Sequence, residues 1–486
     1  MTDTVSSSSA KRLGWFLQCV VQMMRKHCVE LSLFLCLWLT FGLAINSRNQ
    51  FAFTLQQAGV EAIVERRQFS LEGSSTPQLQ LHTYYDGDKP ISDAFIRDGR
   101  QYAAKQPGQS MLGALVYFVL RSFGLNYAQH YLLTSALVTF FTTSLALSAA
   151  AAAVCALVRE ITGEALQWPI ACALTYGLAT TAFVYSGISL HDPIASSFLV
   201  IAFYLAVLIR HRQLSPGRAG VLAALSGVLI GLTLTTSMLP FLMACCLGLY
   251  LVSLRRWNLT AMALAGVIVG LVPLLIYDTI CFGNPFLLAN VAGGYSDTFL
   301  QFRLSNLINK ARFYLWEITS YVPVVWAGVL GLAFLPREFR REQLTMAGFL
   351  LALAIQVLNI ESQGGCQYGP RYLLPAIPYA CIGIAGFHFL RKGIARILAQ
   401  STVTVLAIAS FFISATGAIY GAMYCDTQAY AVGPALTAIQ QGVWRDLPLA
   451  PWLALPWVAS LLLLVLAIRR YNETRNQTHS ANAIAV

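Results

Sequence analysis

Charged residues crowd one short segment of an otherwise apolar chain, residues 92–112, which read SDAFIRDGRQYAAKQPGQSML. Asp93 and Asp98 can each accept a proton, and Lys105 follows at short range, just before a Pro-Gly pair. A positioned carboxylate can take the proton from an attacking hydroxyl, and a nearby cation can stabilise the charge of a leaving group. The segment therefore carries candidate bases and a candidate cation within one loop.

A second pair of ionisable residues, His191 and Asp192, follows the stretch FVYSGISL. Ionisable groups at the boundary of an apolar span are costly and usually mark a site. A simpler interpretation is that Asp192 caps a helix whose first residue is Pro193. Asp192 can serve both purposes, so it remains a candidate acid.

Arg371 lies in the stretch GGCQYGPRY, whose glycines allow close backbone approach. A guanidinium offers two parallel donors to a phosphate, whereas Lys105 would act as a second point charge. Arg371 could instead extend its side chain toward the membrane interface. Polar residues that fall on the same expected face are Tyr102, Tyr277, Asn284, Glu361 and Tyr372.

The composition identifies a polytopic membrane protein. Of 486 residues, 57% are hydrophobic and only 11% are charged, against about 25% charged residues in a typical soluble domain. The net charge of +11 comes from short Lys/Arg clusters between apolar runs. This distribution follows the positive-inside rule and argues against a nucleic-acid partner.

Apolar runs long enough to span a membrane predict an all-α protein with about 12 transmembrane helices between residues 28 and 468. With both termini cytoplasmic, the basic clusters fall on the inner side, and the short outer loops hold only Arg371 and Arg445. The run 111–120 is too short to cross. The expected spans are residues 28–45, 131–157, 167–188, 192–209, 219–237, 239–254, 259–280, 318–336, 344–360, 372–390, 397–420 and 450–468.

This topology leaves residues 1–27 and 469–486 in the cytoplasm and creates two large outer loops, 46–130 and 281–317. The stretch TLQQAGVEAIVERRQFSLE in the first loop predicts an amphipathic helix on the membrane surface. The run 111–120 predicts a second juxtamembrane helix. Because both large loops lie on the outer side in this topology, we expect the active site on that side.

Five stretches of the sequence resemble the GT-C superfamily of integral-membrane glycosyltransferases. The resemblance is to the bacterial branch related to protein O-mannosyltransferases and lipid A aminoarabinose transferases. The matching stretches are NSRNQFAFTLQQAG (46–59), Asp93 with DGRQYAAKQPGQSML (98–112), FVYSGISLHDP (183–193), YDTICFGNPF (277–286) and YGPRYLLPAIPY (368–379).

The resemblance implies roles for individual residues. The family's catalytic aspartate precedes a Lys-x-Pro motif, which matches Asp93 and Lys105, and the lysine lies near the donor phosphate. Asp192 matches a second acidic position, and Arg371 a phosphate contact. Relatives often have an acid just past the first span, where this chain has NSRN (46–49). The base therefore remains open between Asp93, Asp98 (expected about one helical turn away) and other loop acids.

The implied activity is an inverting transfer of a sugar from a polyprenyl-phosphate donor to a hydroxyl of a glycan, lipid or protein, at the outer face of the inner membrane. No cofactor is required by this scheme, and a divalent metal is left open. A secondary transporter or flippase is the main alternative, although no inverted repeat is evident. A lipid-binding protein without catalytic activity is a third.

Overall fold

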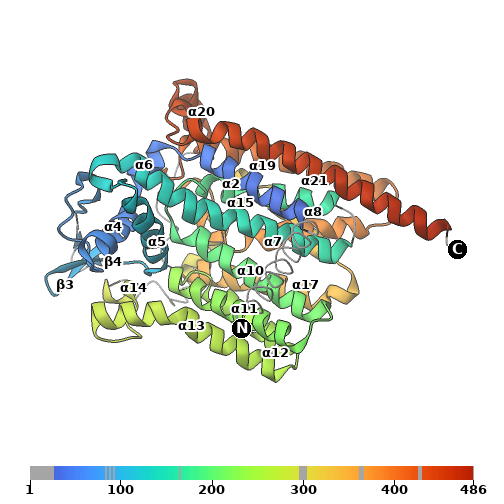
Figure 1. The fold of residues 1–486 in the computed structure, drawn as a ribbon, viewed down its shortest axis with the longest axis horizontal. Coiled ribbons are helices and arrows are strands. Elements are labelled where there is room, and N and C mark those ends of the chain that lie inside the picture. Colours follow the sequence, from blue (N-terminus) through green and yellow to red (C-terminus); the bar gives the residue numbers. More distant parts are fainter. Residues whose placement is uncertain are drawn as a thin grey trace, which may run out of the picture.

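The computed structural model describes residues 27–82, 85–86, 89–90, 93–163, 166–294, 304–360, 366–424 and 430–484. Helices make up most of this part of the chain, and the described strands form two small hairpins (Figure 1). The short elements α4, α5, β3 and β4 gather at one end of the molecule, away from the C-terminus (Figure 1). The expected all-α membrane architecture is confirmed.

In the described part of the first half, the apolar helix α2 is followed by several short elements and then by longer helices. The helices are α2 (Cys28–Leu43), α3 (Ser47–Ala52), α4 (Leu55–Glu61), η1 (Ala62–Arg66), η2 (Pro77–Leu79), α5 (Gly108–Ser122), α6 (Tyr127–Thr139), η3 (Phe140–Ser144), α7 (Leu145–Thr162), α8 (Gln167–Leu178), α9 (Thr181–Tyr185), α10 (His191–His211) and α11 (Pro216–Thr236). The strands are β1 (Tyr85–Asp86), β2 (Lys89–Pro90), β3 (Ala94–Arg97) and β4 (Arg100–Ala103).

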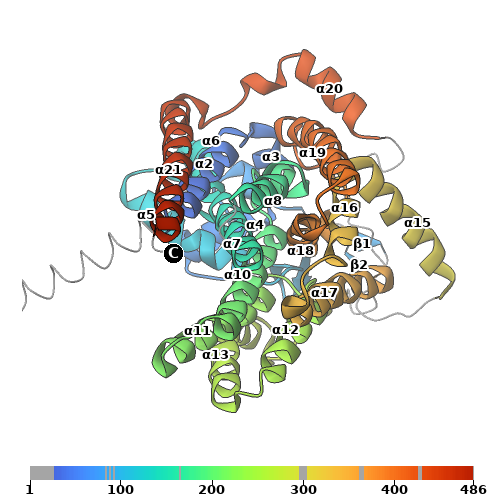
Figure 2. The same ribbon diagram turned by 90° about the vertical axis from the view of Figure 1, so that its right-hand side faces the viewer.

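The second half contains further long helices joined by short ones. They are α12 (Phe241–Ser253), α13 (Trp257–Phe282), α14 (Ala289–Ala292), α15 (Leu304–Tyr321), α16 (Val324–Leu332), η5 (Arg337–Phe339), α17 (Arg340–Asn359), η6 (Arg371–Leu373), α18 (Ile377–Gly383), η7 (Ile384–Phe389), α19 (Ile394–Tyr420), α20 (Val432–Gln440), η8 (Val443–Arg445) and α21 (Ala450–Ile484). Figure 2 looks along the bundle and separates α11, α12 and α13 from the group around α16, α18 and α19.

The chain is a multi-pass membrane protein. In the described part, seven helices are long and apolar enough to cross a membrane, or eight if the bent pair α15–α16 is one span. The expected number of twelve is not reached by this criterion. Several expected spans are short or interrupted: α12 has 13 residues, α8 and α9 are separate, and α15 and α16 meet at 107°. Pro323 immediately precedes α16, where it ends one helix and begins another.

Glycines bring α11 and α13 into unusually close contact. Each helix carries a Gly-x-x-x-Gly pair, Gly227 and Gly231 on α11 and Gly266 and Gly270 on α13. A Cβ atom at Gly227 would lie only 1.9 Å from the Ala263 carbonyl oxygen. Small residues let membrane helices approach closely and gain van der Waals contact. This pairing fixes α11, whose C-terminal end precedes Ser237 of the candidate site.

Candidate active site

A β-hairpin brings the two ends of the charged segment together. Strands β3 and β4 pair in antiparallel register, with Ala94 opposite Ala103. The Ala104 amide donates to the Asp93 carbonyl at 2.7 Å, which extends the pairing by one step. Asp93 therefore enters the hairpin beside the point where the chain leaves it toward Lys105.

Asp93 and Lys105 form the ion pair at the open end of this hairpin. The Lys105 Nζ atom lies 3.0 Å from Asp93 Oδ1, and the two side chains are 18% and 41% exposed. Burial favours the neutral carboxyl, but Lys105, together with Arg371 and His191, holds the pKa of Asp93 below its ordinary value. Burial favours the neutral amine of Lys105, but the charge of Asp93 outweighs this effect and raises the pKa of Lys105.

His191 and Asp192 lie in the first turn of α10. The helix begins at His191, and its N-cap is Leu190. The simpler interpretation, in which Asp192 caps the helix, is therefore wrong. Its carboxylate accepts a hydrogen bond from Ser237 Oγ at 3.0 Å and lies 3.4 Å from His191 Nε2. A carboxylate in the first turn is also stabilised by the helix dipole. Asp192 is 1% exposed and joins α10 to the end of α11.

Arg371 begins the short helix η6 and is buried, with 8% of its surface exposed. It therefore does not extend to the membrane interface. Its Nε lies 3.7 Å from Asp192 Oδ2, and its guanidinium lies 5.0 Å from the centre of the Tyr372 ring. Neither Arg371 Nε nor Asp192 Oδ2 has a hydrogen-bond partner. At 3.7 Å the Arg371–Asp192 contact is too long for a hydrogen bond, so the guanidinium can still bind another anion.

The cluster thus combines two carboxylates, Asp93 and Asp192, with two cations, Lys105 and Arg371. They come from three parts of the chain: the β3–β4 hairpin, the start of α10 and the start of η6. In the described part of the chain, no group of three or more His, Cys, Asp and Glu residues has the arrangement of a metal site. The carboxylates face Lys105 and Arg371 instead, an arrangement that does not fit a bound divalent metal.

Several other sequence candidates lie outside this cluster. Asp98 occupies the hairpin turn with a positive φ of 51°, and its side chain is 89% exposed. It is separated from Asp93 by a four-residue strand, about 14 Å at the usual rise, rather than by a helical turn. Asn284 is exposed, and its side chain accepts from the Phe286 amide. Glu361 lies outside the described residues.

Tyr102 and Tyr277 belong to an aromatic cluster that supports the hairpin. Their rings lie 5.4 Å and 5.8 Å from the ring of Phe282, and both residues are buried. Phe95 of β3 also packs on Tyr102 at 6.0 Å. These tyrosines therefore hold β3 and β4 against the end of α13 and contribute to the site through the hairpin.

Buried amide and hydroxyl side chains surround the charged cluster, and the sequence analysis did not identify them. Gln56 Nε2 lies 3.5 Å from His191 Nδ1, while Ser110 Oγ donates to Gln56 Oε1 at 2.9 Å. Gln109 donates to Ser189 Oγ at 2.8 Å. These contacts fasten α4 and α5 to the start of α10. The pair Gln56-Gln57 at the start of the candidate amphipathic helix was the available signal.

The NSRN stretch that replaces the family's acidic position is also structural. Asn46 caps α3 through the Asn49 amide and donates to the Ala418 carbonyl at 3.0 Å. The Asn49 side chain accepts from the Ala422 amide at 2.7 Å. These buried amides tie the segment after α2 to the end of α19, so this stretch holds the segment in place without adding a negative charge.

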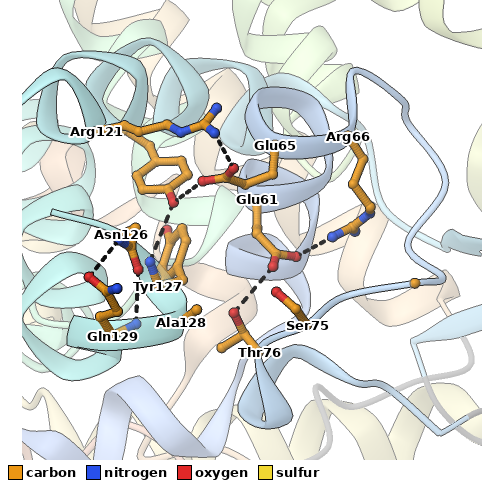
Figure 3. A pocket seen from close by; sticks show the side chains of 12 residues that line it. Glu61, Glu65, Arg66, Ser75, Thr76, Arg121, Asn126, Tyr127, Ala128 and Gln129 are labelled. Carbon is orange, nitrogen blue, oxygen red and sulfur yellow. Dashed lines mark hydrogen bonds and ion pairs between the residues drawn. The ribbon is translucent and has the colours of Figure 1, made fainter. Parts of the chain in front are cut away.

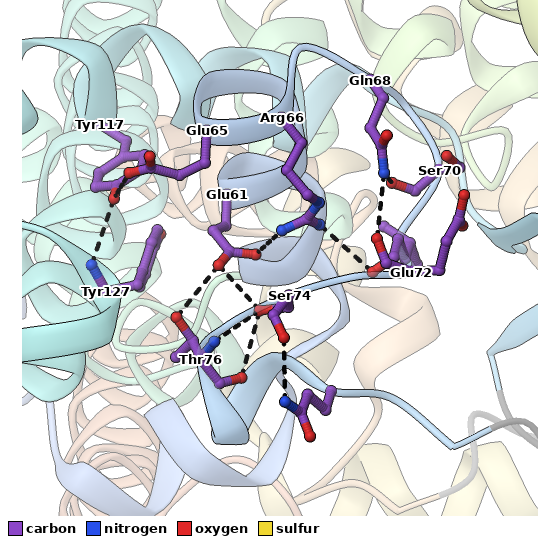
Figure 4. Close-up of polar contacts among 12 residues, drawn as sticks. Glu61, Glu65, Arg66, Gln68, Ser70, Glu72, Ser74, Thr76, Tyr117 and Tyr127 are labelled. Atoms are coloured by element: carbon purple, nitrogen blue, oxygen red, sulfur yellow. Dashed lines mark hydrogen bonds and ion pairs between the residues drawn. The ribbon is translucent and has the colours of Figure 1, made fainter.

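The expected helix near residues 55–66 forms as α4 and η1, but its polar side is not presented to water. All seven residues of α4 are buried, and Glu61 is only 2% exposed. Glu61 pairs with Arg66 at 2.5 Å and accepts from Ser74 and Thr76 (Figure 4). The surface-helix prediction is wrong on this point because the following loop folds over the polar face.

A polar pocket of about 430 Å³ opens beside this helix (Figure 3). Its charges are balanced, because Glu61 pairs with Arg66 and Glu65 pairs with Arg121 at 2.7 Å. Tyr117 of α5 donates to Glu65 at 2.6 Å, and burial raises the pKa of this phenol. The network locks α4 against α5 and so stabilises the corner that holds Gln56 and Ser110.

The chain is similar to known proteins in its three-dimensional structure and not in its sequence. No protein-family model and no curated protein sequence matches the chain. The ArnT structure from Cupriavidus metallidurans bound to undecaprenyl phosphate matches with a TM-score of 0.50 and 11% identity, over 93% of this chain and 77% of that one. The chain therefore shares the overall fold of this ArnT structure.

The archaeal oligosaccharyltransferase AglB from Archaeoglobus fulgidus, in complex with an inhibitory peptide and a dolichol-phosphate, is a more distant match. Its TM-score is 0.45 at 12% identity, and the match covers 85% of this chain but 58% of AglB. The fold shared with the ArnT structure agrees with the resemblance seen in the sequence motifs.

Proposed function

We propose that this chain is a glycosyltransferase that moves a sugar from a polyprenyl-phosphate-linked donor to an acceptor hydroxyl at the outer face of the inner membrane. The observation that carries the proposal is the Asp93–Lys105 ion pair at 3.0 Å. The positive charge of Arg371 also acts on Asp93 and lowers its pKa. This pairing puts a candidate base and a candidate phosphate ligand side by side on a GT-C-type fold.

Asp93 is the proposed general base. The acceptor oxygen attacks the anomeric carbon, its proton passes to the Asp93 carboxylate, and the bond from the anomeric carbon to the phosphate oxygen breaks. The electron pair of that bond leaves with the polyprenyl phosphate. A single displacement of this kind inverts the anomeric configuration. The lowered pKa of Asp93 keeps it ionised and ready to accept the proton at neutral pH.

The same ion pair would weaken Asp93 as a base while Lys105 remains attached to it. A donor phosphate competes with the carboxylate for Lys105, since both are anions that accept charge-assisted hydrogen bonds. When Lys105 turns toward the phosphate, the pKa of Asp93 rises and its basicity increases. Donor binding would thus activate the base.

Arg371 is the proposed second ligand of the donor phosphate. Its guanidinium can form a two-point contact with phosphate oxygens, and its 3.7 Å separation from Asp192 leaves that capacity largely unused. Asp192 is buried and held by Ser237, which favours a positioning role for Asp192 over proton transfer. Tyr372 supports the guanidinium through its ring.

The transporter alternative lacks a specific observation in its favour, whereas the fold matches that of known glycosyltransferases. The decisive experiment offers radiolabelled polyprenyl-phosphate sugars to membranes that contain the chain and follows label into acceptor material. Transfer that requires the chain supports the proposal. Movement of intact lipid-linked sugar across the membrane without cleavage would support a flippase instead.

A further inference from the structure

A lipid-facing groove lies at the opposite end of the bundle from the candidate active site. It encloses about 800 Å³ between the end of α16, the short helix η5 and the first half of α17. Leu332, Leu335, Leu344 and Leu351 contribute to apolar walls, while Arg337 and Arg340 line the same groove. Figure 2 shows α16 and α17 on the same side of the molecule, near α18.

The groove has the depth of one membrane leaflet. Its lining on α17 extends from Arg340 to Leu351, which is about 16 Å along an α-helix. Half of a typical hydrocarbon core is about 15 Å thick. A molecule with its polar group at the arginines would therefore place apolar chains along the groove as far as the middle of the bilayer.

The mouth of the groove is suited to a negative charge. Arg337 and Arg340 are exposed and, within the described part of the chain, neither makes an ion pair. Arg340 is also the first residue of α17, whose N-terminus has no side-chain cap. The Arg340 amide already donates to the Arg337 carbonyl of η5, so the attraction for an anion comes from the two guanidinium groups. Two guanidinium groups, unpaired within the described residues, therefore line the same groove.

The acidic residues nearby do not neutralise this charge. Glu342 is buried on another side of α17, where it accepts from Arg210, His211 and Tyr250. Glu338 does not line the groove. The positive potential at the mouth is thus available to a ligand from the membrane.

The groove mouth and the candidate active site lie on opposite membrane faces. Helix α10 starts at His191 of the site, and its Arg210 contacts the Glu338 carbonyl at the groove end at 3.2 Å. The intervening length of α10 is roughly 30 Å, which matches the hydrocarbon thickness. The groove is therefore separate from the site proposed for the donor.

We propose that this groove binds an anionic phospholipid of the inner leaflet, with its phosphate held by Arg337 and Arg340 and its acyl chains along α16 and α17. Basic pockets between transmembrane helices at the cytoplasmic boundary bind anionic headgroups by this physical arrangement. Apolar complementarity alone would accept any bilayer lipid, whereas the two arginines select for negative charge.

The test uses the delipidated full-length chain in detergent, titrated with phosphatidylglycerol or phosphatidylcholine and examined by native mass spectrometry. We expect preferential retention of phosphatidylglycerol. The double variant Arg337→Gln/Arg340→Gln should weaken that retention roughly tenfold or more. Ala347→Trp, which keeps both arginines and fills the groove, should also reduce it.

The matched control is Arg391→Gln/Lys392→Gln, which removes two exposed charges that do not line the groove. It should retain phosphatidylglycerol as the unmodified chain does. Equal retention of both lipids, or an unchanged affinity in both groove variants, would overturn the proposal. The same is true if the control loses as much affinity as the arginine variant.

Discussion

Asp93 and Lys105 are twelve positions apart in the sequence, yet their side chains meet at 3.0 Å because the β3–β4 hairpin closes between them. The hairpin separates the two aspartates of the segment, since Asp98 lies at its exposed turn. One local motif therefore decides which carboxylate can approach Arg371 and which one faces water. The account of function depends on this relationship.

The first prediction concerns the orientation of the chain. In a background without reactive native cysteines, Asp98→Cys and Gln213→Cys should react with membrane-impermeant reagents from opposite sides, with Asp98→Cys labelled from outside. Both positions are exposed, one at the hairpin turn and the other just after α10. Labelling of both from the same side would contradict an outward-facing site.

The second prediction is that Arg371→Lys weakens donor use while the chain remains folded. Lysine keeps the charge but offers no two-point contact, and a lost charge-assisted hydrogen bond corresponds to roughly ten- to hundredfold in affinity. Steady-state kinetics should show a higher KM for the donor. An unchanged KM would assign Arg371 a purely structural role beside Asp192.

A third prediction uses pH. The active form of Asp93 is the carboxylate, which is present above its pKa and lost as pH falls through it. In the donor-free protein Lys105 lowers this pKa, so the acid limb of kcat/KM for the donor should lie below the ordinary pKa range of aspartate. In Lys105→Gln the effect of burial on the pKa of Asp93 is less opposed, so the acid limb of kcat/KM should move to higher pH.

Lys105→Arg provides the control for the pH profile, because it retains a positive charge near Asp93. Its acid limb should stay close to that of the unmodified chain, even if donor affinity changes. If Lys105→Gln and Lys105→Arg have the same acid limb as the unmodified chain, Asp93 does not titrate as proposed.

The sequence predicted the membrane class and an all-α fold, and it singled out Asp93, Lys105, Asp192 and Arg371, because charges are conspicuous in apolar surroundings. It did not predict the hairpin, although Asp98-Gly99 between AFIR and RQYA is a strong hairpin signal. The segment was expected to place Asp98 a helical turn from Asp93, and both therefore remained candidates.

Other features depend on contacts between distant segments and have no local signature. Arg371 could be assigned to the interface or to a site until its burial against Asp192 was known. Glu61 and its neighbours have an amphipathic pattern, yet the loop that covers them is formed by residues 70–76. Short helices such as α12 and broken ones such as α15–α16 also deviate from a span count based on apolar length.

The central claim is tested most directly by the rate of sugar transfer at saturating radiolabelled polyprenyl-phosphate donor in Asp93→Asn and Asp98→Asn. Asparagine preserves the shape of each side chain and removes the proton acceptor. We predict that Asp93→Asn lowers turnover roughly 10²–10⁴-fold with donor binding retained, and that Asp98→Asn has little effect. An active Asp93→Asn enzyme, with or without loss of activity in Asp98→Asn, would contradict the account.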